Sequence, residues 1–280
     1  MIKYYKLPVA AIASIMLLGF AESAHADTVV FQDGTDNAFV TNYSGTEDTM
    51  LASNTWEASY GSRQNIQVGA SLSPVDHGLL RFDLSSLQGV YSSIDSVTLR
   101  LYLNGSTGVG ATAYTETLQV YSVSSANSGW IEGVNETIAT NGQSTWHYLS
   151  QTGSGTGTTW AGSQGASTTG TDYDSTLLAS YNYDNTGRES YIDLTISGAV
   201  IESWITGENA GLLFKTTTEA ATGDLDKRIE FYSSEVTTES LRPSLIINFT
   251  AIPEPSSAAL VSGLLVVGGA ILIRKRRVRA

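Results

Sequence analysis

The sequence predicts a mainly β fold, a jelly-roll-like antiparallel β-sandwich with one short helix, flanked by a signal peptide and a C-terminal transmembrane segment. Three observations support this prediction. Apolar residues recur with the alternation of strands along residues 27–250, turn-forming residues separate these runs, and only 15% of the 280 residues are charged. A composition of this kind, rich in Ser, Thr and Gly, is typical of extracellular β proteins.

The N-terminus has the three parts of a secretory signal peptide. Two lysines precede an apolar run at residues 7–20, and Ala24 and Ala26 then form the small-x-small pattern that a signal peptidase reads. We therefore predict a signal peptide at residues 1–26, with cleavage before Asp27.

Short apolar runs with a period of two predict the strands. In the clearest run, Val97, Leu99 and Leu101 alternate with Thr, Arg and Tyr, which puts the three apolar residues on one face of a strand. Similar runs lie at residues 28–31, 66–69, 78–84, 118–123, 191–194, 211–215, 229–232 and 245–249. Several strands separated by turns favour a sandwich over alternating strands and helices.

One segment has a helical period instead. Ile196, Val200 and Trp204 recur at intervals of four. Thr195 is a candidate N-cap before them, and Gly207 stands where a helix commonly ends. The sequence therefore predicts one short helix with Trp204 in the core.

Residues 124–185 have the composition of a long loop insertion, with many Gly, Ser and Thr residues. Large aromatic side chains in such a loop either pin it to the core or form exposed platforms for a ligand. Both interpretations stay open at this point. The candidate glycan-binding residues are Trp130, Trp146, Trp160, His147 and Tyr148.

Acidic turns suggest a calcium ion, because calcium takes hard oxygen ligands. Asp33, Asp36 and Asn37 form one candidate site, and Asp224 with Asp226 forms the other. The alternative is that Asp and Asn stabilise turns through hydrogen bonds to their own backbone. One structural calcium is therefore a hypothesis, and the sequence indicates no other cofactor.

Charge and composition exclude several functions. Residues 27–255 hold 8 Lys and Arg against 26 Asp and Glu, which leaves a formal charge of −18. Such a surface repels phosphate backbones, so we expect no nucleic-acid partner. The chain has no cysteine, which excludes disulfides and thiolate chemistry. His77 and His147 lack metal or triad spacing, and we predict no catalytic residues and no enzyme.

The C-terminus combines an apolar span with a basic end. Residues 258–273 carry no charge, and the tip at residues 274–280 holds five cations that positive-inside behaviour would keep in the cytoplasm. As a helix the span would rise about 24 Å, which is short against a hydrocarbon core of roughly 30 Å. We expect the chain to be held in a membrane through this span.

The tripeptide Pro253, Glu254, Pro255, followed by this span and tip, resembles the PEP-CTERM sorting signal of Gram-negative, biofilm-forming bacteria, over residues 251–280. The resemblance implies that an exosortase processes the tail. It further implies transient anchoring in the inner membrane, followed by delivery to the cell surface or the extracellular matrix.

Residues 77–87 and 94–102 resemble the DNRLRE domain, a carbohydrate-binding-module-like β-sandwich. Further matching pieces lie at residues 193–195, 209–215, 231–235 and 242–245, so that the resemblance spans about residues 27–250. It implies a non-catalytic protein that binds exopolysaccharide. Two alternatives remain, a purely structural surface or biofilm adhesion component without glycan binding, and a polysaccharide-active enzyme.

Overall fold

The computed structural model describes residues 25–70, 74–104, 113–186, 189–219 and 227–252. Asp27–Thr250 form one compact unit, to which the following description applies. Most of the predicted signal peptide, Asp224 and Asp226, the tripeptide Pro253, Glu254, Pro255, the apolar span and the basic tip lie outside the described residues. Within the described residues, no helix has the length and apolar character needed to cross a membrane.

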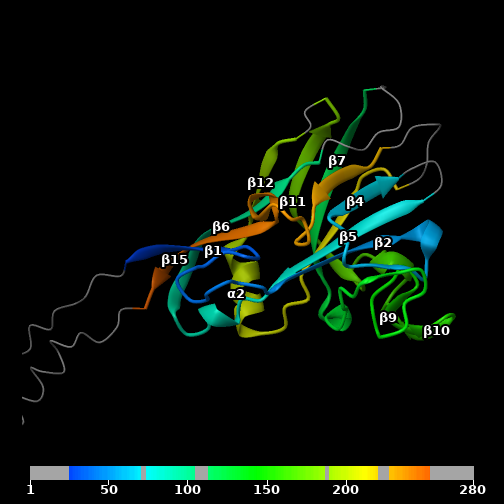
Figure 1. Ribbon diagram of the computed structural model, residues 1–280. Helices are drawn as coiled ribbons and strands as arrows, with labels where there is room; N and C mark the ends of the chain where they lie inside the picture. The colour runs from blue at the N-terminus through cyan, green and yellow to red at the C-terminus, as the bar shows by residue number, and fades with distance from the viewer. Residues whose placement is uncertain (1–24, 71–73, 105–112, 187–188, 220–226, 253–280) are drawn as a thin grey trace, which may run out of the picture. The chain divides into compact units, whose positions relative to one another are not determined.

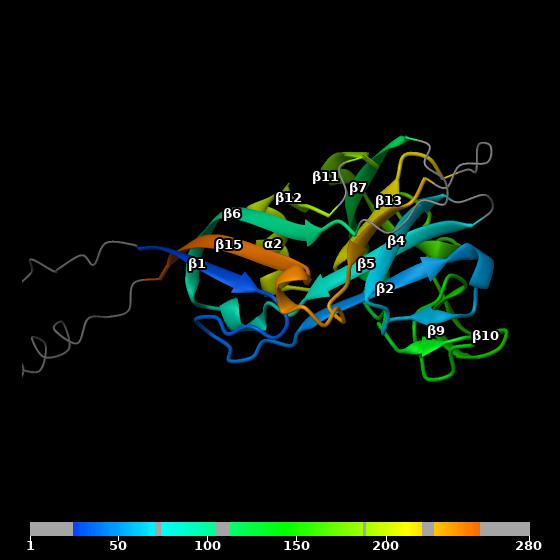
Figure 2. The same cartoon turned by 45° about the horizontal axis from the view of Figure 1, so that its top comes forward.

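The mainly β, sandwich-like character is confirmed, because the described residues form two main antiparallel sheets (Figures 1 and 2). The four-stranded sheet has the order β1 (Ala26–Phe31), β15 (Ser244–Ala251), β6 (Tyr91–Tyr102), β12 (Tyr191–Ile196). The seven-stranded sheet has the order β11 (Tyr173–Asp184), β7 (Thr115–Val123), β13 (Leu212–Thr216), β5 (Val75–Phe82), β4 (Asn65–Ala70), β14 (Ile229–Tyr232), with β2 (Thr46–Ala52) paired to β5. Two small sheets pair β3 (Ser59–Tyr60) with β8 (Asn135–Glu136) and β9 (Tyr148–Gly153) with β10 (Thr156–Thr159).

The period-two pattern has the predicted effect in the four-stranded sheet. Leu99 and Leu101 on β6 are fully buried, and they pair in register with Leu194 and Ile192 on β12, which are also buried. Between them on β6, Arg100 pairs with Asp193 on β12, forms an ion pair with it at 2.7 Å, and stays partly in solvent. One face of this sheet is therefore core, as expected from residues that alternate in direction along a strand.

The predicted helix exists but begins later than expected. It is α2 (Gly198–Thr206), which packs against β6 and follows Ser197 as the N-cap residue. Thr195 and Ile196 belong to β12 instead, because Ile196 continues the alternating burial of that strand and pairs with β6. Trp204 is buried, as predicted for a core residue.

The prediction of a loop throughout residues 124–185 is wrong in two places. The strands β9 and β10 pair as a hairpin within the glycine-rich stretch, and Tyr173–Asp184 form β11, an edge strand paired with β7. Half of the residues of β11 are Ser, Thr, Asn or Asp, and most of its side chains are at least partly exposed. Polar composition therefore hid a strand whose formation depends on pairing with β7.

The remaining segment, residues 124–172, covers the outer face of the seven-stranded sheet and is called the covering segment below. Leu51, Leu79 and Leu213 come from the adjacent strands β2, β5 and β13, and they form one apolar cluster with Trp130 and Trp160. Both tryptophans are at most 3% exposed. The seven-stranded sheet thus carries a core on this face that the covering segment completes.

The ring N–H of each of these two tryptophans also donates a hydrogen bond to the main chain. Trp130 Nε1 donates a hydrogen bond to the Ala210 carbonyl at 2.7 Å, and the Arg81 guanidinium lies 4.5 Å from the centre of the Trp130 ring. Trp160 Nε1 donates to the Thr145 carbonyl at 3.0 Å. A buried indole with its N–H bonded to the main chain is fixed in place. Trp130 and Trp160 therefore anchor the covering segment on the seven-stranded sheet, and they are called pins below.

We predict that Trp130→Ala lowers the free energy of unfolding by about 3–5 kcal/mol, because it opens a large cavity and leaves the Ala210 carbonyl without its donor. Urea denaturation of the purified protein measures this change. Trp56→Ala is the matched control, since Trp56 is 56% exposed and its loss should change stability by less than about 0.5 kcal/mol. Equal losses in the two variants would contradict the assignment of Trp130 as a pin.

Candidate functional site

A surface cavity of about 350 Å³ lies in the covering segment. Its volume is at the lower end of the range of about 300–1,000 Å³ for ligand pockets, which suits a small ligand or a short part of a longer chain. The lining combines aromatic rings with hydroxyl and amide groups. It consists of His147, Tyr148, Thr159, Trp160, Gly162, Ser163 and Gln164.

Trp56 extends the aromatic wall of this cavity onto the open surface. Its ring stacks on that of His147, with 5.0 Å between the centroids and 18° between the planes. The backbone N–H of His147 also donates a hydrogen bond to the Trp56 carbonyl at 3.0 Å. The His147 ring in turn meets Tyr148 edge to face at 5.9 Å. Since Trp56 is 56% exposed, these three rings present aromatic surface to solvent beside a cavity.

The five predicted glycan-binding residues divide between surface and core. His147 and Tyr148 line the cavity and are partly exposed. Trp130 and Trp160 are buried, as in the pinning alternative, and Trp160 also forms part of the cavity lining. Trp146 is half-buried, and its ring lies 5.3 Å from that of the buried His77.

Sequence reasoning missed Trp56. The residue follows the short 3₁₀ turn Ser53–Thr55 and precedes Glu57, in a run without apolar periodicity. A tryptophan among polar turn residues does not belong to the apolar face of a strand or helix. This isolation was the sequence signal that could have indicated an exposed aromatic side chain.

A charged cluster lies next to Trp146, with His77 and Lys215 buried and the Glu219 side chain 36% exposed. His77 Nδ1 is 2.7 Å from the Gly165 carbonyl oxygen, and its Nε2 is 2.9 Å from Glu219 Oε1, to which Lys215 Nζ also donates at 2.8 Å. Burial by itself would raise the pKa of Glu219, but the hydrogen bonds and charges of His77 and Lys215 outweigh burial and lower the pKa to about 2.

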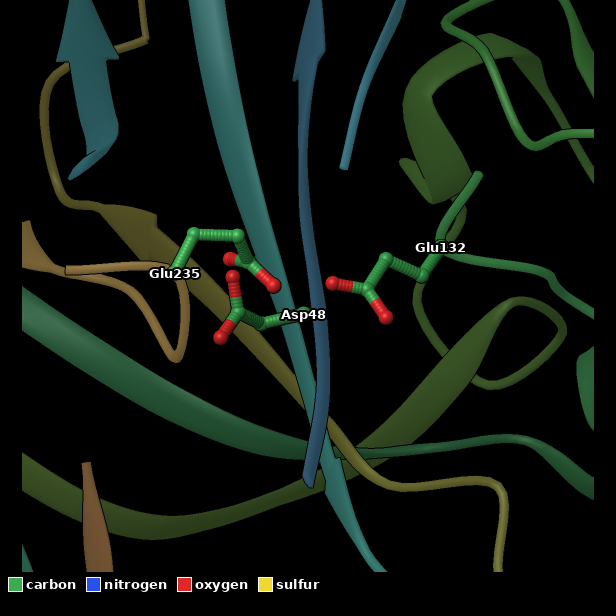
Figure 3. Close-up of side chains that lie close together, drawn as sticks. All are labelled: Asp48, Glu132 and Glu235. Atoms are coloured by element: carbon green, nitrogen blue, oxygen red, sulfur yellow. The ribbon is translucent and has the colours of Figure 1, made fainter. Parts of the chain in front are cut away.

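A second group of side chains meets at the other end of the covering segment. Asp48 on β2, Glu132 in the covering segment and Glu235 after β14 each place a carboxylate oxygen within 4.8 Å of the others (Figure 3). It is the one such group of three or more His, Cys, Asp and Glu residues among the described residues. Their positions in the sequence gave no indication that they would meet.

The predicted calcium residues near the N-terminus are engaged in turn hydrogen bonds. Asp33 Oδ1 accepts from the Thr46 N–H at 3.0 Å, and Asp36 Oδ1 accepts from the Asn42 N–H at 2.7 Å. Asn37 Oδ1 accepts from two further backbone N–H groups. The Asn37 contacts are those of the turn-stabilising alternative, whereas Asp33 bonds to a residue 13 positions away at the start of β2. Calcium at these residues stays a prediction.

No protein-family model matches the chain, and a search of curated proteins also found no match. The resemblances to the PEP-CTERM signal and to the DNRLRE domain therefore stay predictions. Function has to be inferred from the chemistry of the site.

We predict that part of the stability of the fold is lost at acidic pH because Glu219 becomes protonated. The folded carboxylate keeps its charge down to a pKa of about 2, against an ordinary value of 4.5, so its contribution is complete above pH 4.5 and is lost as the pH falls towards 2. Glu219→Gln should melt at a lower temperature at pH 7 and should lose less stability between pH 4.5 and 2. Thermal melts across this range test it.

Glu208→Gln is the control for that experiment, because Glu208 is exposed on the surface. Its acid dependence should match that of the unchanged protein. Parallel melting curves for Glu219→Gln and the unchanged protein would contradict the charged cluster.

Proposed function

We propose that this chain is an exported, non-catalytic protein of the cell surface or extracellular matrix, whose jelly-roll-like sandwich binds exopolysaccharide. The observation that supports binding is the cavity of His147 and Tyr148 with the exposed Trp56 beside it. Aromatic faces pack against the apolar faces of sugar rings, and nearby polar groups bond the sugar hydroxyls. Such a surface fits a carbohydrate better than a purely apolar ligand.

The chemistry of the lining favours an uncharged glycan. Thr159, Ser163 and Gln164 offer hydroxyl and amide groups, and the lining contains neither a carboxylate nor a lysine or arginine. The formal charge of −18 on residues 27–255 would repel a uronic-acid polymer. The lack of lining carboxylates supports the non-catalytic part of the proposal, because glycoside hydrolysis commonly needs two of them across the bond.

The limits of the compact unit are compatible with processing at both ends. The unit runs from Asp27 to Thr250, so removal of residues 1–26 would take only the first residue of β1 and the hydrogen bond from the Ala251 N–H to the His25 carbonyl, and cleavage near Pro253 would leave β15 whole. In this proposal an exosortase acts on the tail, and membrane anchoring through the apolar span is transient.

Glycan binding predicts that Trp56→Ala weakens retention. Loss of one stacked ring removes about 0.5–1.5 kcal/mol beyond its buried area, so the dissociation constant should rise about tenfold. Affinity electrophoresis in gels that contain neutral or uronic-acid polysaccharides, followed by titration calorimetry with the glycan that retards the protein, measures this effect.

Tyr191→Ala is the matched control, because Tyr191 is 47% exposed but lies on β12 in the four-stranded sheet. It should bind as the unchanged protein does. If no polysaccharide retards the unchanged protein, glycan binding is wrong and the purely structural role replaces it. Cleavage of the glycan during the assay would overturn the non-catalytic assignment.

Processing predicts two new chain ends. Mass spectrometry of the protein recovered from the cell surface should find Asp27 as the first residue and should not find residues 274–280. A mature protein that retains the basic tip would contradict exosortase processing and would indicate a permanent single-pass anchor.

A further inference from the structure

The carboxylates of Asp48, Glu132 and Glu235 meet although no counter-charge holds them together. Figure 3 shows Glu132 and Glu235 reaching toward Asp48 from opposite sides of β2. Their closest oxygens lie within 4.8 Å of one another. None of the ion pairs in the described part of the chain includes any of the three residues. Like charges at this separation repel strongly in a buried site.

Hydrogen bonds compensate these charges only in part. Asp48 is 1% exposed, and its Oδ2 accepts from the Ser234 N–H at 2.7 Å, while Glu235 Oε1 accepts from the Ser234 hydroxyl at 3.0 Å. The side chains of Glu132 and Glu235 are half-buried, but Glu132 Oε1 and Glu235 Oε2 are buried atoms and have no hydrogen-bond partner. A buried carboxylate oxygen without a donor costs more than an ordinary unpaired polar atom, because it carries charge. A cation between these two oxygens would supply the missing partner.

We propose that Asp48, Glu132 and Glu235 bind one calcium ion, which fastens the covering segment to β2 and to the turn after β14. Calcium holds oxygen ligands at about 2.3–2.6 Å, so two ligands of one ion lie at most about 4.6–5.2 Å apart. The three oxygens lie within 4.8 Å of one another, which is compatible with this limit. Magnesium usually keeps several waters and binds through one or two carboxylates, so three protein carboxylates favour calcium.

The chemistry of the three ligands also argues against zinc and copper. The ligand set holds only carboxylates, without histidine or cysteine, and this favours hard cations over zinc or copper. Three carboxylates supply up to six oxygens, and water can complete a shell of six to eight. The proposal is independent of glycan binding, because none of the three residues lines the cavity.

Thermal melting of the full chain in mild detergent tests the site. Calcium at a hundred times its dissociation constant should raise the melting temperature by about 5–10 °C relative to the protein in chelator. Magnesium at the same concentration should give a clearly smaller rise. An unchanged melting temperature in calcium would overturn the proposal, and an equal or larger effect of magnesium would overturn the choice of calcium.

The variant Glu235→Gln separates the loss of calcium binding from a general loss of stability. The amide removes one charge without a change in size, so this variant should melt in chelator no lower than the unchanged protein, and it should not respond to calcium. Asp36→Asn is the control and should respond fully. If Asp36→Asn abolishes the response and Glu235→Gln does not, the ion binds in the N-terminal turn and the proposed site is wrong.

Discussion

The outer face of the seven-stranded sheet is apolar and has to be covered, and the rest of the structure depends on this constraint. All five residues of β13 are buried, so this central strand has core on both of its faces. Leu79 and Leu213 lie side by side on the outer face and have contact with Trp130 and Trp160 of the covering segment. Burial of two tryptophans contributes to offsetting the entropy lost when a glycine-rich and serine-rich segment becomes ordered.

Both candidate sites follow from this arrangement. Trp130 is held by Ala210, and Glu132 comes two residues later, beside β2. Gly61, directly after β3, leaves room for this part of the covering segment, because a Cβ atom at that position would clash with the Glu132 carbonyl oxygen. On the other side of the segment, Trp160 forms part of the lining of the cavity with His147. The pins thus place a group of carboxylates at one site and aromatic rings at the other.

Local patterns predicted most of the fold, whereas the sites depend on contacts distant in sequence. The strand around Leu99 was predictable because alternation is a property of neighbouring residues. The secondary structure at Ile196 was ambiguous, because its spacing fits a helix and its burial fits a strand. Pairing with β6 makes it part of the strand β12. No spacing rule could bring Asp48, Glu132 and Glu235 together, because tertiary packing alone makes them neighbours.

The covering segment shows two ways of burying a carboxylate. Asp172 is fully buried, but it accepts backbone N–H groups of Gly162, Ser163 and Thr168 at 2.8–2.9 Å, and although burial opposes ionisation these bonds lower its pKa. Its charge needs no ion. At the other end, Glu132 has a buried oxygen without a donor and carboxylates as neighbours. The same segment supplies donors to one acid and leaves an oxygen of the other without one, and the proposed cation would provide the missing positive charge at the second.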